Sequence, residues 1–78
     1  MQINDFVRVI DQESEFKDNY GKITRIDDGI IKVIIFMNKS FKRIEISQNM
    51  NKFFIRHFRP DQVMVANDEA ETYLLLNS

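Results

Sequence analysis

The feature that most constrains the fold of this chain is a tight-turn signal followed at once by an apolar stretch. The turn signal is Asp27-Asp28-Gly29, and an Asp-Gly pair supplies the positive φ angles that a two-residue hairpin requires. The stretch over residues 30–36 reads Ile-Ile-Lys-Val-Ile-Ile-Phe, and its β-branched side chains favour extended backbone. Because apolar residues fall on both of its faces, we expect a central strand that is either buried on both sides or covered by a partner on one of them.

Shorter strand-like segments flank this stretch. They are residues 6–10, 21–26, 41–47, 52–58 and 63–65, with a long polar loop over 11–20 and turns over 37–40 and 48–51. Ile23 and Ile26 are three residues apart rather than two, which predicts a β-bulge or a strong local twist. Residues 59–62, Arg-Pro-Asp-Gln, predict a turn of 3₁₀ character because proline presets φ there.

Residues 67–78 allow two interpretations. In the first, Asn67 or Asp68 caps a short helix whose first turn carries acids, as the helix dipole favours. In the second, residues 72–76, Thr-Tyr-Leu-Leu-Leu, form an added strand. We expect a short helical or disordered tail over 67–78, so that the barrel domain spans residues 1–66.

Taken together, these segments predict an all-β fold. The chain has 78 residues, which is enough for one domain with one core. Five or six short strands in so small a domain predict a closed or partly closed β-barrel, because a barrel removes exposed strand edges. We expect Val7, Ile23, Val33 and Val65 to meet in its interior.

Composition excludes several classes of function. The chain has no cysteine, which excludes disulfides, thiolate metal sites and thiol nucleophiles. His57 is the only histidine and thus the only imidazole base, so we expect no catalysis, no cofactor and no dedicated metal site. The chain starts without a secretion-type signal, and its apolar runs are too short for a membrane helix. We therefore expect no membrane insertion and a location in the cytoplasm or the plastid stroma.

Charge is distributed unevenly along the chain. Residues 39–59 carry six basic residues and one acid, a net +5, so the remainder carries −6 of the total of −1. The same stretch holds four phenylalanines, and basic side chains interleaved with aromatic rings suit an acidic protein partner or a single-stranded nucleic acid. In the alternative, the rings fill the barrel and the cations solvate its outer face. The residues that we expect to contact a partner are Lys42, Arg43, Lys52, Phe53, Arg56, His57 and Arg59.

Three segments resemble known small barrels. Residues 5–9 (Asp-Phe-Val-Arg-Val) and 21–26 (Gly-Lys-Ile-Thr-Arg-Ile) resemble the first two strands of Src-homology-3-type barrels. The second also resembles the KOW motif of ribosomal and transcription-associated proteins. Residues 57–63 (His-Phe-Arg-Pro-Asp-Gln-Val) resemble the closing turn and last strand of three photosynthetic subunits. These are the variable chain of ferredoxin–thioredoxin reductase, the PsaE-type subunit of photosystem I and the NdhS-type subunit of the NADH-dehydrogenase-like complex.

This resemblance implies a noncatalytic accessory subunit that docks on a larger photosynthetic or redox complex. We therefore expect a protein-binding module that offers its basic and aromatic stretch to an acidic partner. Two alternatives remain: a KOW-like protein that binds single-stranded nucleic acid, and a small regulator of a nucleic-acid enzyme whose acidic remainder mimics phosphates. Binding to nucleic acid would weaken steeply as salt rises, because counterions are released on binding.

Overall fold

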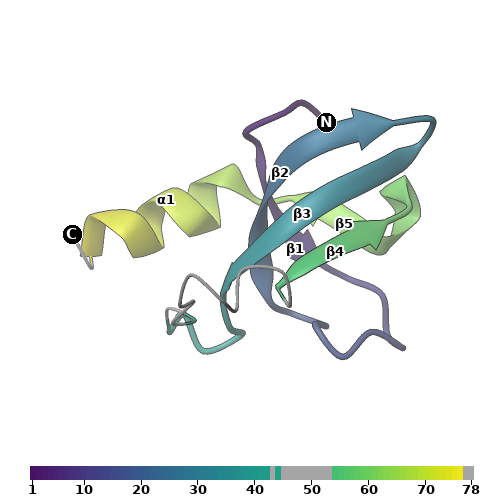
Figure 1. Cartoon of the computed structure of the whole chain (residues 1–78). Coiled ribbons are helices and arrows are strands. Elements are labelled where there is room, and N and C mark those ends of the chain that lie inside the picture. The colour runs from purple at the N-terminus through teal and green to yellow at the C-terminus, as the bar shows by residue number, and fades with distance from the viewer. Residues whose placement is uncertain (43, 45–53, 77–78) are drawn as a thin grey trace.

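The computed structural model describes residues 1–42, 44 and 54–76. In chain order its elements are β1 (Phe6–Val9), β2 (Tyr20–Asp27), β3 (Ile30–Met37), β4 (Ile55–Phe58), the 3₁₀ turn η2 (Pro60–Gln62), β5 (Val63–Val65) and α1 (Asn67–Leu76). The strands form one antiparallel sheet in the order β4-β3-β2-β1-β5 (Figure 1). The expected all-β class is confirmed, and β3 lies between two neighbours as predicted, but the chain fully buries only one of its faces because the residues between its buried positions are half-buried.

The hairpin of β2 and β3 has the predicted turn. Asp28 and Gly29 have φ angles of 47° and 77°, the positive values that an Asp-Gly turn provides. The pairing register shifts between Ile23 and Arg25, which is the predicted bulge. Ile23 and Ile26 are three positions apart in β2, yet they pair with Val33 and Ile31, which are two positions apart in β3 and share one face. The extra residue of the bulge accounts for this difference in spacing.

The two edge strands are joined by a short connection. Only Arg59 and η2 separate Phe58 at the end of β4 from Val63 at the start of β5. Five steps of extended chain span at most about 17 Å, so the two edges must approach each other and the sheet must curl. In the part of the chain that the structure describes, β4 pairs with β3 and β5 pairs with β1, so the curled sheet stays open between its edges.

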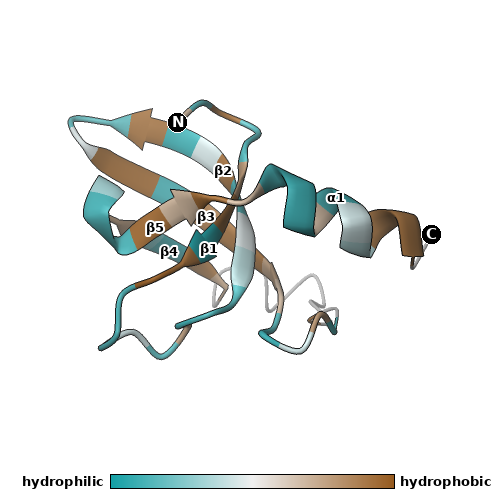
Figure 2. Cartoon of the chain, turned by 180° about the vertical axis from the view of Figure 1, so that it is seen from behind, coloured by the Kyte–Doolittle hydropathy of each residue, from teal (hydrophilic) through white to brown (hydrophobic). Residues whose placement is uncertain are grey.

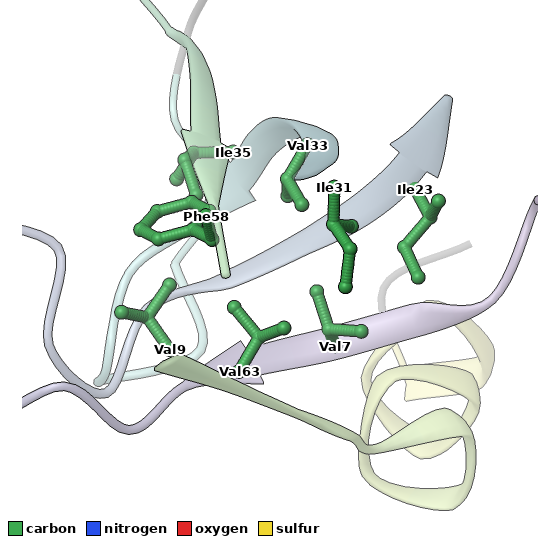
Figure 3. Close-up of a cluster of buried hydrophobic side chains, with 8 residues drawn as sticks. All are labelled: Val7, Val9, Ile23, Ile31, Val33, Ile35, Phe58 and Val63. Atoms are coloured by element: carbon green, nitrogen blue, oxygen red, sulfur yellow. The ribbon is translucent and has the colours of Figure 1, made fainter. Parts of the chain in front are cut away.

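The inner face of the curled sheet holds the main core (Figure 3). Its buried members are Val7, Val9, Ile23, Ile31, Val33, Ile35, Phe58 and Val63. The prediction that Val65 belongs to this interior is wrong, because Val65 is 41% exposed. Val65 lies opposite Val7, but β5 is at the edge of the sheet, and none of the strands that the structure describes covers its far side. Val63, which is 2% exposed, takes the interior position instead.

A second apolar cluster joins the outer face of the sheet to α1. Its buried members are Tyr20, Met37, Ala66, Ala70 and Tyr73, with Phe6, Phe36 and Leu74 packed against them. The tail is therefore a helix over Asn67–Leu76, and it is not an added strand. No helix in the described residues is long and apolar enough to cross a membrane.

Asn67 does not cap the helix in the way that the sequence suggested. Its side-chain oxygen accepts a hydrogen bond from the Phe6 backbone N–H at 2.8 Å, and its amide nitrogen donates to Asp5 Oδ1 at 3.3 Å. These bonds tie the first turn of α1 to the start of β1. The acids expected in the first turn, Asp68 and Glu69, are present and suit the positive end of the helix dipole.

The segment after β3 differs from the predicted strand over residues 41–47. Phe41 has a φ of 61°, a left-handed conformation that a strand does not accommodate. Lys42 and Ile44 also lie outside any strand. The other residues of this predicted strand, the predicted turn over 48–51 and residues 52–53 of the next predicted strand lie outside the described residues.

Candidate functional site

The structure describes four of the seven residues expected to contact a partner, and these four do not form one cluster. Three of them, Arg43, Lys52 and Phe53, lie outside the described residues. Lys42 follows the end of β3, and its carbonyl oxygen accepts a hydrogen bond from the Asn38 N–H. Arg59 follows Phe58, which pairs with Ile31 near the start of β3. Since a strand rises about 3.3 Å per residue, roughly 20 Å of β3 separates the two cations.

Arg56 points to the inner side of the sheet and is engaged within the molecule. It lies opposite Val33, and its guanidinium carbon is 5.0 Å from the centroid of the Phe16 ring. One of its terminal nitrogens lies 3.6 Å from Glu15 Oε1, and the other donates to the Ile55 carbonyl oxygen at 3.0 Å. Arg56 therefore holds the loop between β1 and β2 against β4.

Arg59 is engaged in the turn that follows it. Its Nε donates to Asp61 Oδ1 at 3.2 Å, and its backbone N–H donates to the Gln62 side chain at 2.7 Å. Because the side chains of Arg59 and Asp61 are 65% and 73% exposed, this ion pair contributes little to stability and leaves Arg59 reachable from solvent.

The structure brings a different set of basic residues together. Lys32 in β3 lies directly opposite Arg25 of β2 on one side and His57 of β4 on the other. Directly opposed side chains of antiparallel strands lie on one face, about 5 Å apart at Cβ. Since Ile31 and Val33 face inward, Lys32 and its two partners face outward.

The next row along this outward face is mainly apolar. Ile34 lies opposite Lys22 of β2 and Ile55 of β4, and both isoleucines are half-buried. We call the two rows together the basic face. Its members are Lys22, Arg25, Lys32, Ile34, Ile55 and His57.

The charges on the basic face are only partly compensated. Arg25 forms an ion pair with Asp27, whereas Lys22 and Lys32 take part in none of the ion pairs between described residues. Like charges directly opposite each other in a sheet are destabilising. The repulsion between Arg25 and Lys32 therefore slightly lowers the stability of the free protein. An anionic group bound over the two side chains would reduce this repulsion.

A polar cluster fixes α1 over the other end of the outer face. The Tyr20 hydroxyl donates to Glu69 Oε2 at 2.5 Å, and Arg8 Nη1 lies 3.5 Å from Glu69 Oε1. Burial, reinforced by the bond to Glu69, raises the pKa of Tyr20 above its ordinary value of 10.0 and keeps the hydroxyl protonated. Figure 1 shows α1 projecting away from the hairpin of β2 and β3, so the helix does not cover the basic face.

Lys22, Arg25 and Lys32 were not predicted as site residues, because they do not form a contiguous charged stretch in the sequence. The pairing of Arg25 with Lys32 could have been predicted, because a two-residue turn at Asp28-Gly29 fixes the register of the hairpin. The place of His57 beside Lys32 depends on the pairing of β3 with β4, which no local signal specifies.

Within residues 1–42, 44 and 54–76, no three His, Asp or Glu side chains are grouped so that they could hold a metal ion. A scan against protein-family models found no match, and searches of curated proteins and of solved structures found none either. What this site can do is therefore inferred from its own geometry.

Proposed function

We propose that this protein is a noncatalytic protein-binding module whose basic face docks an acidic and partly apolar surface of a partner. The observation that supports the proposal most directly is the row in which Lys32 lies between Arg25 and His57, beside the half-buried pair of Ile34 and Ile55. Protein interfaces combine an apolar centre with a polar rim, and this face has both parts.

The two kinds of side chain have different roles in such a contact. Ile34 and Ile55 lose their remaining exposed surface when a partner covers them, which supplies affinity through the hydrophobic effect. Lys22 and Lys32 attract an acidic surface during encounter and set its register, which supplies association rate and specificity. Arg59 follows β4 and extends the charge beyond His57.

Binding of single-stranded nucleic acid is the second candidate, because the cations Lys22, Arg25 and Lys32 also suit phosphates. Such proteins also stack bases on exposed aromatic rings beside the cations. On the basic face the apolar positions of the described strands carry isoleucines, and the exposed Phe41 lies beyond the far end of β3. This arrangement favours a protein partner over nucleic acid.

The resemblance of the sequence to photosynthetic subunits supports a larger photosynthetic or redox complex as the partner. An accessory subunit of this kind needs no chemistry of its own, so His57 acts as part of the docking face. We expect His57→Ala to weaken association with that complex and to leave the chemistry of the complex unchanged once the subunit is bound.

Charge reversal on the basic face tests the proposal. The probe is a capped, fluorescein-labelled peptide of alternating aspartate and leucine, and the readout is its fluorescence anisotropy. We expect the double variant Lys22→Glu, Lys32→Glu to bind this peptide roughly tenfold more weakly than the unmodified protein. The single variants Lys22→Glu and Lys32→Glu are compared with Lys39→Glu, which makes the same charge change in the exposed turn beyond β3 and which we expect to bind within about twofold of the unmodified protein.

The same assay separates the two candidate functions. A labelled oligothymidylate is titrated in parallel at low and moderate salt. Tighter binding of the oligonucleotide than of the peptide, with a steep loss as salt rises, would contradict protein docking and favour nucleic acid. An equal loss of peptide binding in Lys39→Glu would show that the basic face is not the docking surface.

A further inference from the structure

A second surface lies at the other end of the molecule, where α1 leaves the sheet. Phe41 and one side of α1 enclose a largely apolar hollow of about 490 Å³. We call this hollow the helix groove. The residues that line it are Phe41, Asp68, Glu69, Thr72, Tyr73 and Leu76.

The helical residues of the groove form one continuous stripe. Asp68, Thr72 and Leu76 follow one another at intervals of four, and residues three or four apart are neighbours on a helix surface. At a rise of 1.5 Å per residue, the stripe from Asp68 to Leu76 is about 12 Å long. That length matches three or four residues of an extended chain, so the groove suits a linear segment.

One wall of the groove is an aromatic ring held in an uncommon backbone conformation. Phe41 has a φ of 61°, which is rare for a bulky residue, and such conformations cluster at functional sites. The Asn38 side-chain oxygen accepts hydrogen bonds from the Ser40 and Lys42 N–H groups at 2.9 and 3.0 Å and fixes the turn. The Phe41 ring stacks on Tyr20 at a centroid distance of 5.1 Å, yet Phe41 remains 43% exposed.

The charge of the groove is negative. Helix α1 contains three acids and no basic residue, as its sequence Asn-Asp-Glu-Ala-Glu-Thr-Tyr-Leu-Leu-Leu shows. Arg8 balances Glu69, whereas Asp68 has no partner in the ion pairs between described residues. The last turn of α1 also lacks the basic residue that would offset the negative end of the helix dipole.

The C-terminal end of α1 is apolar. Figure 2 shows α1 changing from hydrophilic at its start to hydrophobic at its end, and Leu76 is 79% exposed. A side chain that suits both the aromatic and aliphatic walls and the carboxylate of Asp68, which has no ion-pair partner among the described residues, has an apolar stem and a cationic head. Lysine and arginine are the two residues with that character, and their heads also interact favourably with aromatic rings.

We propose that the helix groove binds an extended segment of a partner protein that presents a lysine or arginine between apolar side chains. The stem packs against Phe41 and Leu76, and the charged head lies near Asp68. This inference is independent of the docking proposed for the basic face, because the groove prefers a segment of the opposite charge. With both surfaces, the protein would join an acidic surface to a basic one.

Two peptides test the charge preference of the groove. The probes are capped serine-leucine-lysine-leucine-serine and the same peptide with glutamate in place of lysine, titrated into the ¹⁵N-labelled full chain. We expect the lysine peptide to shift the backbone amide signals of Phe41, Thr72 and Tyr73. We expect the glutamate peptide to bind about fivefold more weakly or worse. Equal affinity for the two peptides, or no shifts at millimolar lysine peptide, would overturn the inference.

Two matched pairs of variants test the location. Leu76→Ala removes a groove residue, whereas Leu75→Ala removes a neighbour that is equally exposed, at 78% against 79%, and does not line the groove. Asp68→Asn removes a groove charge, whereas Glu71→Gln removes one from the same helix outside the groove. We expect only the first member of each pair to weaken binding of the lysine peptide, by about threefold or more.

Two further outcomes would overturn the proposal for the helix groove. Equal effects within either pair would overturn the inference. Signals of Phe41 and Thr72 that shift when the protein alone is diluted would also overturn it, because a second copy of the chain would then fill the groove. Since the basic-face variants leave these residues intact, failure here is distinguishable from failure of the proposed function.

Discussion

At the scale of single residues, Gly21 shows how closely the two central strands approach. A Cβ atom at Gly21 would collide with Val33 Cγ1 and lie 2.7 Å from the Ile34 carbonyl oxygen. The Val33 side chain can rotate, but the carbonyl belongs to the backbone of β3 and cannot move without disturbing the β2–β3 pairing. Position 21 therefore accommodates only glycine without a shift of the β3 backbone.

We expect Gly21→Ala to lower the free energy of unfolding by about 2 kcal/mol, because overpacking a core forces backbone shifts. Urea denaturation measures the change. Gly29→Ala is the control, since nothing lies within 4 Å of its added Cβ and only its φ of 77° causes strain, of about 1 kcal/mol. A larger loss in Gly29→Ala than in Gly21→Ala would contradict the packing described for β2 and β3.

Tyr20 predicts a dependence of stability on pH. Burial raises the pKa of Tyr20 in the folded protein above its ordinary value of 10.0. The folded state therefore favours the protonated hydroxyl. The resulting gain in the free energy of unfolding is fully present below the pKa of Tyr20 in the unfolded chain. It is lost as pH rises through the higher pKa of Tyr20 in the folded protein.

We expect Tyr20→Phe to cost about 1 kcal/mol at pH 8, where the bond to Glu69 is lost. The difference in unfolding free energy between the unmodified protein and the variant should shrink above about pH 10, as the tyrosine ionises. Urea denaturation from pH 8 to pH 11 measures it. A difference that stays constant over this range would contradict the assigned role of the hydroxyl.

At the scale of secondary structure, local signals predicted the elements whose cause is local. Asp28-Gly29, the spacing of Ile23 and Ile26, and Pro60 each act within a few residues, and each predicted feature is present. The side chain of Asn67 could not be placed in this way. Its bond to the Phe6 N–H joins residues 61 positions apart, and that contact exists only after β1 and β5 have paired.

Arg56 gives a test at this scale, because it joins β4 to the loop between β1 and β2. We expect Arg56→Ala to lower the free energy of unfolding by about 1 kcal/mol through loss of its contacts with Phe16 and Glu15. Amide hydrogen exchange should also accelerate at Asn19, whose N–H donates to the Phe16 carbonyl within that loop. Unchanged stability and exchange, with loss of binding to the acidic peptide, would show that Arg56 serves docking instead.

At the scale of the whole molecule, the curl of the sheet follows from the short connection between its edges, and function depends on which side chains the curl turns outward. The sequence predicted a basic surface but located it in residues 39–59. Residues 43 and 45–53 of that stretch lie outside the described residues, and within the described ones the folded chain gathers Lys22, Arg25, Lys32 and His57 from three strands. Only the pairing within the β2–β3 hairpin is visible in the sequence, because the remaining neighbour is set by tertiary contacts.

The folded molecule also separates a group of basic residues from a group of acidic ones. The formal net charge is −1, yet the basic face runs along residues 22–25 of β2, whereas the acidic helix α1 packs against the end of the hairpin that holds Tyr20 and Met37. A total charge near zero therefore conceals two surfaces of opposite sign. If both proposals hold, each surface favours a partner that the other repels.

The measurement that tests the central claim most directly is a map of backbone amide shifts on the ¹⁵N-labelled full chain as the aspartate–leucine peptide is added. Protein docking through the basic face predicts the largest shifts at Lys22, Lys32, Ile34 and His57, with little change at Thr72 and Tyr73. Saturation of the peptide with no shift at Lys32 or Ile34 would contradict it.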